Sequence, residues 1–273
     1  MSPYFSLIEA ERDSAICVEV PHAGLSVPEI VRDEVQAPQD AILRDADIYV
    51  DRLTAEAPAR GAALLVAKVS RYVVDLNRAA DDVDALTVPD HPDPRGRQAR
   101  GVVWRTTTDG RSVLRIPLNY ERFLQRIERF HAPYHRALEG RLQAIRARHG
   151  YAILVAMHSM PSVGRAGHAD TGTRRADVVP GTLGRTTADP RVIELVDAHF
   201  RDAGLKVRHD EPYRGGYTTG YYGRPQEGWH AIQIELNRAL YVNEATQEPI
   251  AGGFEALRES LGTLFAALAQ LSL

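Results

Sequence analysis

The sequence predicts a single α/β domain in which helices flank a central, mostly parallel sheet. Short apolar runs alternate along the chain with helical stretches, as they do in such folds. Several of these runs are apolar enough to be buried on both faces, which is typical of parallel strands. The 273 residues, 44% of them hydrophobic, suffice for one large core, and no long Pro/Gly/Ser-rich linker divides them. We therefore expect one domain over residues 1–273.

Five apolar runs are the predicted strands. They cover residues 15–20, 63–69, 72–76, 152–156 and 231–236. The predicted helices lie at about 40–57, 119–149, 189–203 and 252–271. The third of these has a clear start, because Asp189 in "TTADPRV" can cap a helix and precedes a proline.

Two segments interrupt the alternation. Residues 80–118 are rich in Pro, Asp and Arg and are interpreted as an insertion, with a small hairpin around "TTTDGRSV". Residues 164–185 are rich in glycine and are interpreted as a long loop rather than a domain boundary. Neither changes the expectation of one domain.

Charge and composition argue against several classes of protein. A net charge of −3 and a pI near 6.4 give no electrostatic footprint for nucleic acid. No basic leader with an apolar segment indicates a signal peptide, and no run of about 18 apolar residues indicates a membrane span. The single cysteine, Cys17, lies in an apolar run and is expected to be a buried thiol of a cytoplasmic protein. The oligomeric state is not indicated.

Polar side chains lie at or near the ends of four of the predicted strands. His22 follows the first, "DLNR" (75–78) the third and His158 the fourth, while Glu235 lies within the fifth. Ligands of open α/β sheets bind beyond the carboxyl ends of the strands, so these residues are expected to converge. Together they include groups that can bind a metal or transfer a proton.

The stretch "AMHSMPS" places Ser159 next to His158 and raises the alternative of a serine hydrolase. No G-x-S-x-G nucleophile elbow is present, and neighbouring residues of a strand point to opposite faces. The helical H-E-x-x-H motif, the Walker A loop and the G-x-G-x-x-G turn are also missing. The serine hydrolase is therefore disfavoured.

A zinc site built from separate segments remains, with His22 and His158 as two ligands. Catalytic zinc takes three protein ligands and leaves one position for water. An aspartate of "LRDADIYVDRL" is the candidate for the third, namely Asp45, Asp47 or Asp51. A second histidine pair, His131 and His135, lies four residues apart on a predicted helix. Because Pro133 separates the two, they are interpreted as surface residues or as residues that support a metal ligand without binding the metal.

Six motifs, taken together, resemble one known family. They are "VPHAG", "RDADIYVDRL", "SRYVVDLNR", "MHSMPS", "PYRGGYTTGYYGRP" and "HAIQIELNRALYVNE". In this order, over about residues 15–245, they are similar to the N-formylglutamate amidohydrolase (deformylase) family. The resemblance implies the mixed sheet of the zinc carboxypeptidases and aspartoacylases, and removal of the formyl group from N-formyl-L-glutamate in histidine degradation.

The resemblance also implies a set of metal ligands. His22, His158 and an acidic residue of "DAD" would hold one zinc ion per chain, and the spacing to "Y-V-x-x-L" favours Asp47 over Asp45. The carboxypeptidases use a glutamate three residues after the first histidine, but Leu25 occupies that position here and cannot bind zinc.

Substrate contacts follow from the same resemblance. Asn77 and Arg78 match the Asn-Arg pair that holds a substrate carboxylate, since an arginine can grip a carboxylate through two parallel hydrogen bonds. A structural ion pair with Asp75 is the alternative for Arg78. Further candidates for contacting a dicarboxylate are Arg71, Arg214 and Tyr217, and simple anchoring of a glycine-rich loop is the alternative for the tyrosine.

Glu235 is implied to be the general base. In an extended strand Gln233 and Glu235 share the face opposite to Ile234, which leaves the carboxylate free of the apolar packing. Two other functions remain open. One is deacylation of another N-acyl amino acid at the same site, and the other is non-catalytic binding of a metal or metabolite.

Overall fold

The computed structural model describes residues 2–97, 100–166 and 169–273. One six-stranded sheet has the order β1-β3-β2-β4-β6-β5, and a separate pair is formed by β7 and β8. The sheet strands are β1 (Phe5–Ile8), β2 (Ile16–Val20), β3 (Ala63–Ala67), β4 (Ala152–Met160), β5 (Val178–Gly181) and β6 (Trp229–Asn237). The prediction of four strands near residues 16, 63, 152 and 231 is confirmed. Residues 98–99 and 167–168, inside the expected insertion and loop, lie outside the described residues.

The central strands are parallel and fully buried. β2 pairs with β4 and β4 pairs with β6, both in parallel, whereas β5 runs antiparallel to β6 at the edge. Every residue of β2, β4 and β6 is buried, as expected for strands covered on both faces. The predicted mixed, mostly parallel α/β fold is thus confirmed. The predicted loop over 164–185 is wrong in its last part, because β5 lies there.

The chain forms two compact units. The first comprises Met1–Ser6, Pro21–Ile48 and Val66–Glu139, and the second comprises Leu7–Val20, Tyr49–Leu65 and Gly140–Leu273. The expectation of a single domain stays a prediction.

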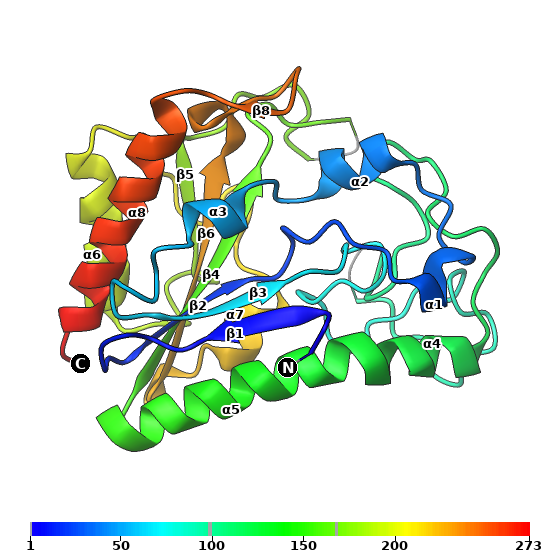
Figure 1. Ribbon diagram of the computed structural model, residues 1–273, viewed down its shortest axis with the longest axis horizontal. Helices are drawn as coiled ribbons and strands as arrows, with labels where there is room; N and C mark the ends of the chain where they lie inside the picture. Colours follow the sequence, from blue (N-terminus) through cyan, green and yellow to red (C-terminus); the bar gives the residue numbers. More distant parts are fainter. Residues whose placement is uncertain (1, 98–99, 167–168) are drawn as a thin grey trace. The chain divides into compact units, whose positions relative to one another are not determined.

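In the second unit, helices pack on the sheet and on one another. The strand β5 contacts α6 (Pro190–Asp202), α6 contacts α8 (Gly253–Gln270), and α8 contacts α3 (Val50–Leu53) (Figure 1). α6 begins as predicted, because the Asp189 side chain accepts a hydrogen bond from the Arg191 N–H and Pro190 follows it. The remaining elements are α7 (Tyr217–Tyr222), η2 (Pro225–Glu227), η3 (Arg238–Leu240), β7 (Val242–Asn243) and β8 (Glu248–Pro249).

One long helical rod consists of α4 (Tyr120–Arg126), a π-helical turn η1 (Ile127–His131) and α5 (Ala132–His149), and appears green in Figure 1. Its residues up to Glu139 belong to the first unit and those from Gly140 to the second. This confirms the helix predicted over 119–149. The first unit also contains α1 (Glu29–Arg32) and α2 (Gln39–Asp45). Its apolar cluster joins α2 to distant segments and includes Val35, Ala41, Ile42, Tyr72, Trp104 and Val113.

Three predictions of local structure need correction. Residues 72–76 form no strand, although their side chains are buried. The helix predicted over 40–57 is divided into α2 and α3, and Tyr49 between them has a φ of 65°, which an α-helix does not allow. The hairpin predicted around "TTTDGRSV" (106–113) is reduced to one antiparallel bridge between Thr106 and Ser112.

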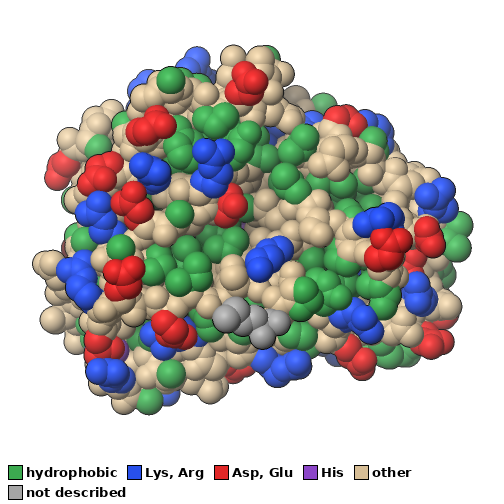
Figure 2. Space-filling model, viewed as in Figure 1, with side chains coloured by type: hydrophobic (Ala, Val, Ile, Leu, Met, Phe, Trp, Pro, Cys, Tyr) green, Lys and Arg blue, Asp and Glu red, His purple; other side chains and the backbone are tan. Residues whose placement is uncertain are grey.

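Charged side chains are mixed with apolar ones on the surface (Figure 2), and the one cysteine is buried. On the face drawn in Figure 2, basic and acidic side chains are interspersed among apolar ones. Within the described ranges no helix has the length and apolarity that crossing a bilayer requires. Cys17 is fully buried, as predicted, and burial raises the pKa of its thiol to about 12.

Candidate metal and catalytic site

His22, Asp47 and His158 form a buried group that could hold a metal ion. Each offers one imidazole nitrogen or carboxylate oxygen, and these atoms all lie within 4.8 Å of one another. Two imidazoles and one carboxylate match the donor set of catalytic zinc sites, which use three protein ligands and keep a fourth position open. The donor set therefore fits a divalent ion such as zinc, and its members are the residues that the sequence resemblance implies.

The end of α2 brings Asp47 to His22. The Ala46 N–H still donates to the Ile42 carbonyl at 3.0 Å, but the Asp47 N–H donates to the His22 carbonyl, also at 3.0 Å. The helix therefore stops, and Oδ2 of Asp47 lies 3.6 Å from Nδ1 of His22. The interruption of the predicted helix is thus the feature that pairs the aspartate with the histidine.

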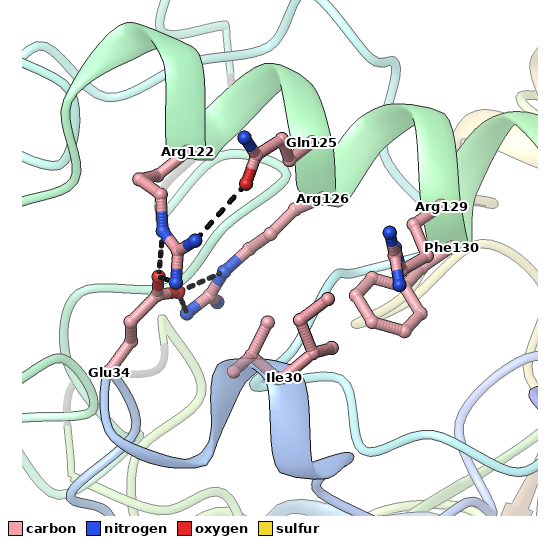
Figure 3. A pocket seen from close by; sticks show the side chains of 8 residues that line it. Ile30, Glu34, Arg122, Gln125, Arg126, Arg129 and Phe130 are labelled. Atoms are coloured by element: carbon pink, nitrogen blue, oxygen red, sulfur yellow. Dashed lines mark hydrogen bonds and ion pairs between the residues drawn. The ribbon is translucent and has the colours of Figure 1, made fainter.

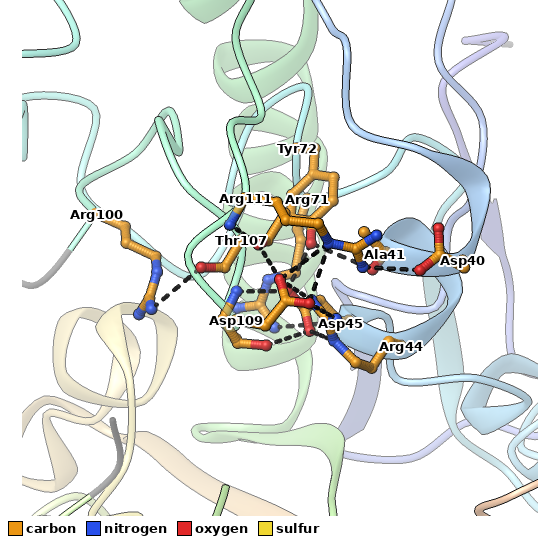
Figure 4. Close-up of polar contacts among 11 residues, drawn as sticks. Asp40, Ala41, Arg44, Asp45, Arg71, Tyr72, Arg100, Thr107, Asp109 and Arg111 are labelled. Atoms are coloured by element: carbon orange, nitrogen blue, oxygen red, sulfur yellow. Dashed lines mark hydrogen bonds and ion pairs between the residues drawn. The ribbon is translucent and has the colours of Figure 1, made fainter. Parts of the chain in front are cut away.

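Asp45, the alternative ligand, is held by other partners. Its carboxylate accepts hydrogen bonds from the Tyr72 hydroxyl at 2.5 Å and from the Thr108 N–H and hydroxyl at 2.9 and 2.5 Å. Arg44 Nε lies 3.1 Å away in the same network (Figure 4). Burial alone raises the pKa of Asp45, but the hydrogen bonds from Thr108 and Tyr72 outweigh it and lower that pKa. Asp45 therefore ties α2 to the segment around Thr108.

Asp75, the first residue of "DLNR", orients the His22 ring. Its Oδ1 lies 2.7 Å from Nε2 of His22. Since an ionised carboxylate only accepts, Nε2 carries the proton, and Nδ1, which faces Asp47, is the nitrogen that could bind a metal. Burial raises the pKa of Asp75, but the charge of Arg71 and the hydrogen bond from His22 hold it well below the ordinary value. The sequence prediction gave Asp75 no such role, although its place in the motif between Arg71 and Arg78 was visible.

Arg71 is engaged by the same carboxylate. Its Nη2 donates to Oδ2 of Asp75 at 2.9 Å, and its guanidinium carbon lies 4.4 Å from the centre of the Trp104 ring. Trp104 Nε1 also donates to Oδ2 of Asp75, at 3.0 Å. Burial by itself would lower the pKa of Arg71. The negative charges of Asp75 and the nearby aspartates have the larger combined effect and raise this pKa above its ordinary value, so the side chain is charged. Much of the charge expected to meet a substrate is therefore offset within the protein.

Asn77 and Arg78 follow Asp75 in an irregular segment. Asn77 is buried, and its N–H donates to Oδ1 of Asp75 at 3.0 Å. Arg78 is partly exposed and donates from Nη1 to the Asn77 carbonyl at 2.9 Å. The alternative for Arg78 was an ion pair with Asp75. The ion pair of Asp75 is formed with Arg71 instead, and the charge of Arg78 only helps to lower the pKa of Asp75.

Glu235 lies beside His158 in the sheet. The two are register partners of the parallel strands β4 and β6, and both are buried. Nε2 of Gln233 donates to Oε1 of Glu235 at 2.9 Å, and Oε1 of Gln233 accepts from the Gly216 N–H at 2.8 Å. The predicted sharing of one face by Gln233 and Glu235 is thus observed, and the amide fixes one carboxylate oxygen.

Arg214 and Tyr217 lie at the start of the α7 region. Arg214 is exposed and its carbonyl accepts from the Leu183 N–H at 2.8 Å. Tyr217 is half-buried, and its ring stacks on Tyr221 with 5.2 Å between centroids. The glycine-rich motif "PYRGGYTTGYYGRP", expected to be a loop, contains the short helix α7.

Tyr213, which senses the charge of Glu235, and its partner Arg175 were not predicted. Arg175 donates from Nη1 to the Tyr213 hydroxyl at 3.1 Å and pairs through two nitrogens with Asp170. Burial and the charge of Glu235 raise the pKa of Tyr213 to about 12, so the phenol stays protonated. These residues come from the glycine-rich segment and from "PYRGG", whose spacing carries no signal that they meet.

Ser159 has a structural partner rather than a catalytic one. Its hydroxyl accepts a hydrogen bond from Nε of the buried Arg238 at 3.1 Å. As neighbours in β4, His158 and Ser159 point to opposite faces. The geometry therefore gives no serine–histidine pair at these adjacent positions.

Comparisons with known proteins agree with these motifs. The family model of N-formylglutamate amidohydrolase matches residues 14–242. The N-formylglutamate deformylase of Pseudomonas aeruginosa is 31% identical over 239 residues, covering 86% of this chain and 84% of that protein. The enzyme of the same name from Pseudomonas putida is 30% identical over 235 residues, with 84% and 82% covered.

Solved structures show the same fold. The crystal structure of N-formylglutamate amidohydrolase from Ralstonia eutropha JMP134 superposes with a TM-score of 0.88 at 28% identity, covering 98% of both chains. A gene product from Agrobacterium tumefaciens shares the fold with a TM-score of 0.61 at 20% identity, over 97% of this chain and 96% of that one. The resemblance inferred from six motifs is thereby confirmed, and the chain belongs to the N-formylglutamate amidohydrolase family.

Proposed function

We propose that the protein is a zinc-dependent amidohydrolase that converts N-formyl-L-glutamate and water to formate and L-glutamate, a step of histidine degradation. The names of the relatives and of the matching family support the substrate. The observation that carries the chemistry is the His22, Asp47 and His158 group, together with Glu235 as the sheet neighbour of His158.

His22, Asp47 and His158 are proposed to hold the ion. When bound, zinc supplies Lewis-acid chemistry, because it acidifies water and polarises a carbonyl group. Asp75 keeps the His22 ring in the tautomer that offers Nδ1. Three protein ligands are the number that catalytic zinc sites use.

Glu235 is proposed to move the proton. It takes a proton from the water that attacks the formyl carbon, and it delivers a proton to the amino nitrogen as the C–N bond breaks. The hydrogen bond from Gln233 to Oε1 holds the carboxylate in place. The products are formate and glutamate with a free amino group.

Asn77 and Arg78 are proposed to bind a carboxylate of the substrate, which orients the formyl group for attack. Arg78 is the stronger candidate of the two nearby arginines, because Arg71 is paired with Asp75. Arg71, Arg214 and Tyr217 are proposed as further contacts to a dicarboxylate, and the exposure of Arg214 allows it to reach a ligand.

The test is formate release from N-formyl-L-glutamate compared with N-formyl-L-aspartate and N-acetyl-L-glutamate. We expect the first to be preferred, activity to vanish with a strong chelator, and added zinc to restore it. Preference for another acyl group or amino acid would instead favour a different N-acyl amino acid deacylase. Bound zinc without hydrolysis of any of the three would favour a binding protein.

A further inference from the structure

Residues 72–77 are buried and Arg78 is half-buried, and this segment is not part of the sheet. A buried segment outside a β-ladder must find other partners for its carbonyl groups, since an unpaired buried carbonyl costs about 1–3 kcal/mol. The Asp75 N–H donates to the Val102 carbonyl at 2.7 Å, but this satisfies a donor and no carbonyl of the segment. The Asp75 and Asn77 carbonyl groups accept from the N–H and from Nη1 of Arg78. The carbonyl groups of Val73, Leu76 and Arg78 accept from the long helical rod.

Three side chains of the rod donate to these carbonyl groups. Nη1 of Arg126 lies 3.0 Å from the Val73 oxygen. The Nε2 atoms of two histidines contact two further carbonyl oxygens of the segment. His135 Nε2 lies 3.0 Å from the Leu76 oxygen, and His131 Nε2 lies 2.8 Å from the Arg78 oxygen. The two histidines thus hold the carbonyl groups on either side of Asn77.

The protonation of both rings follows from their partners. A carbonyl oxygen only accepts, so Nε2 carries the hydrogen in each ring. Burial lowers the pKa of His131 and lowers that of His135 to about 3, so both rings are neutral near pH 7. Because each Nε2–H is committed to a carbonyl, it serves as a fixed donor.

The π-helical turn sets the direction of these donors. The Ala132 N–H bonds the Ile127 carbonyl, five residues back, and Pro133 next to it has no N–H to offer. Arg126 and His135 are nine residues apart, which corresponds to opposite sides of a regular α-helix at about 100° per residue. One extra residue in the turn reduces this to about 80°. Both side chains can therefore face the same segment.

Arg126 is itself fixed at the other end of the rod. Its guanidinium is buried and bonds Oε2 of Glu34 through Nε at 3.0 Å and Nη2 at 2.6 Å. Arg122 pairs with the other oxygen of Glu34, as Figure 3 shows. The ion pairs of Arg122 and Arg126 with Glu34 thus hold the part of the rod from which the two histidines project.

We propose that His131 and His135 are positioning residues, which fix the backbone on both sides of Asn77 so that Asn77 and Arg78 can bind the α-carboxylate of the substrate. This inference rests on the proposed function for the identity of the substrate. The positions of the two donors, 2.8 and 3.0 Å from the Arg78 and Leu76 oxygens, carry the structural part.

The test compares variants that remove or keep the donor. His131→Leu and His135→Leu remove the Nε2–H, whereas His131→Gln and His135→Gln keep an N–H at a similar distance from the backbone. The matched control is His199→Leu, because His199 is also partly buried and bonds the Ser260 hydroxyl through Nε2 at 3.0 Å, in α6. If a leucine variant does not fold, His135→Asn, whose amide is too short to reach Leu76, replaces it.

Two measurements are made on the full-length protein. Hydrogen exchange of the peptide over 72–80 should lose about tenfold in protection in the leucine variants, and recover in the glutamine variants. Kinetics are compared on N-formyl-L-glutamate and on 4-formamidobutanoate, which is the same molecule without the α-carboxylate. KM for the first should rise about tenfold or more, with little change for the second.

The outcomes separate the two proposals. Unchanged exchange in the leucine variants would overturn the positioning role, and so would equal kinetic losses on both substrates or a similar loss in the His199 control. A wild-type protein that does not hydrolyse N-formyl-L-glutamate would refute the proposed function. In that case the exchange measurement alone decides whether the histidines fix the segment.

Discussion

Replacing Asp75 by asparagine tests how much the metal group depends on one buried charge. Oδ1 of Asp75 faces Nε2 of His22 at 2.7 Å and the Asn77 N–H at 3.0 Å. Oδ2 faces Nη2 of Arg71 at 2.9 Å and Nε1 of Trp104 at 3.0 Å. All four partners are donors, so an asparagine can satisfy only one pair, and its amide group opposes the other.

The expected magnitude follows from this count. Two hydrogen bonds are lost, at least one of them to a charged or metal-binding side chain, and Arg71 is left without its buried counterion. Breaking a buried ion pair by removing one partner costs about 3–5 kcal/mol. Losing the carboxylate that orients a metal-binding histidine weakens metal affinity by about 10–100-fold.

The assay measures both quantities separately. Urea unfolding of metal-free Asp75→Asn gives the loss in free energy, and competition with a coloured chelator gives the zinc affinity. The matched control is Asp45→Asn, which removes another buried charge two residues from Asp47. The Asp45 carboxylate bonds Tyr72 and Thr108. The control should lose stability and keep zinc affinity near that of the wild type. Wild-type zinc affinity in Asp75→Asn, or an equal loss in the control, would refute the reasoning.

The other predictions concern single side chains. Glu235→Gln should keep zinc and lower kcat by about 10²–10⁴-fold, and a near-normal kcat would remove Glu235 from the proton transfer. Asp47→Ala should lose zinc in a metal analysis while Asp45→Ala retains it, and the reverse would exchange their roles. Arg78→Ala should raise KM for N-formyl-L-glutamate more than for 4-formamidobutanoate, and equal increases would contradict the carboxylate contact. Burial lowers the pKa of His135 from 6.5 to about 3, so the unfolded chain takes up that proton first as the pH falls. The histidine therefore favours the fold above pH 6.5, and this stability is lost between about pH 6 and 3 by up to ~1.4 kcal/mol per pH unit. Urea unfolding of His135→Gln should give a shallower pH dependence in that window, whereas parallel curves would show that the buried ring titrates normally.

The sequence predicted the parts of the molecule that local patterns determine. The continuous apolar runs of β2, β4 and β6 can be read directly, because strands buried on both faces need no polar alternation. The start of α6 was visible in Asp189 and Pro190. Since parallel strands end at one edge of a sheet, the sequence predicted that His22 and His158 would lie close together.

What the sequence could not predict depends on distant partners. Residues 72–76 have the composition of a strand, but the side chains of Arg126, His131 and His135 bond the carbonyl groups of the 72–78 segment, and no local pattern contains that information. Likewise, α2 ends because the Asp47 N–H bonds the His22 carbonyl, 25 residues earlier in the chain. The role of Asp75 depends on the same contact between remote segments.

The π-helical turn lets the rod contain one residue more than a regular helix that carries the same donors. Deleting one residue between 127 and 131 would convert the turn to regular α-helix, and Arg126 and His135, then eight residues apart, would still point about 80° from each other. A regular helix of the present length would instead rotate Arg126 by about 100° relative to His135, so that Arg126 could no longer reach the Val73 oxygen while His135 reaches Leu76. Relatives that share this architecture should therefore either keep the π-helical turn or show a gap of one residue between Arg126 and His135.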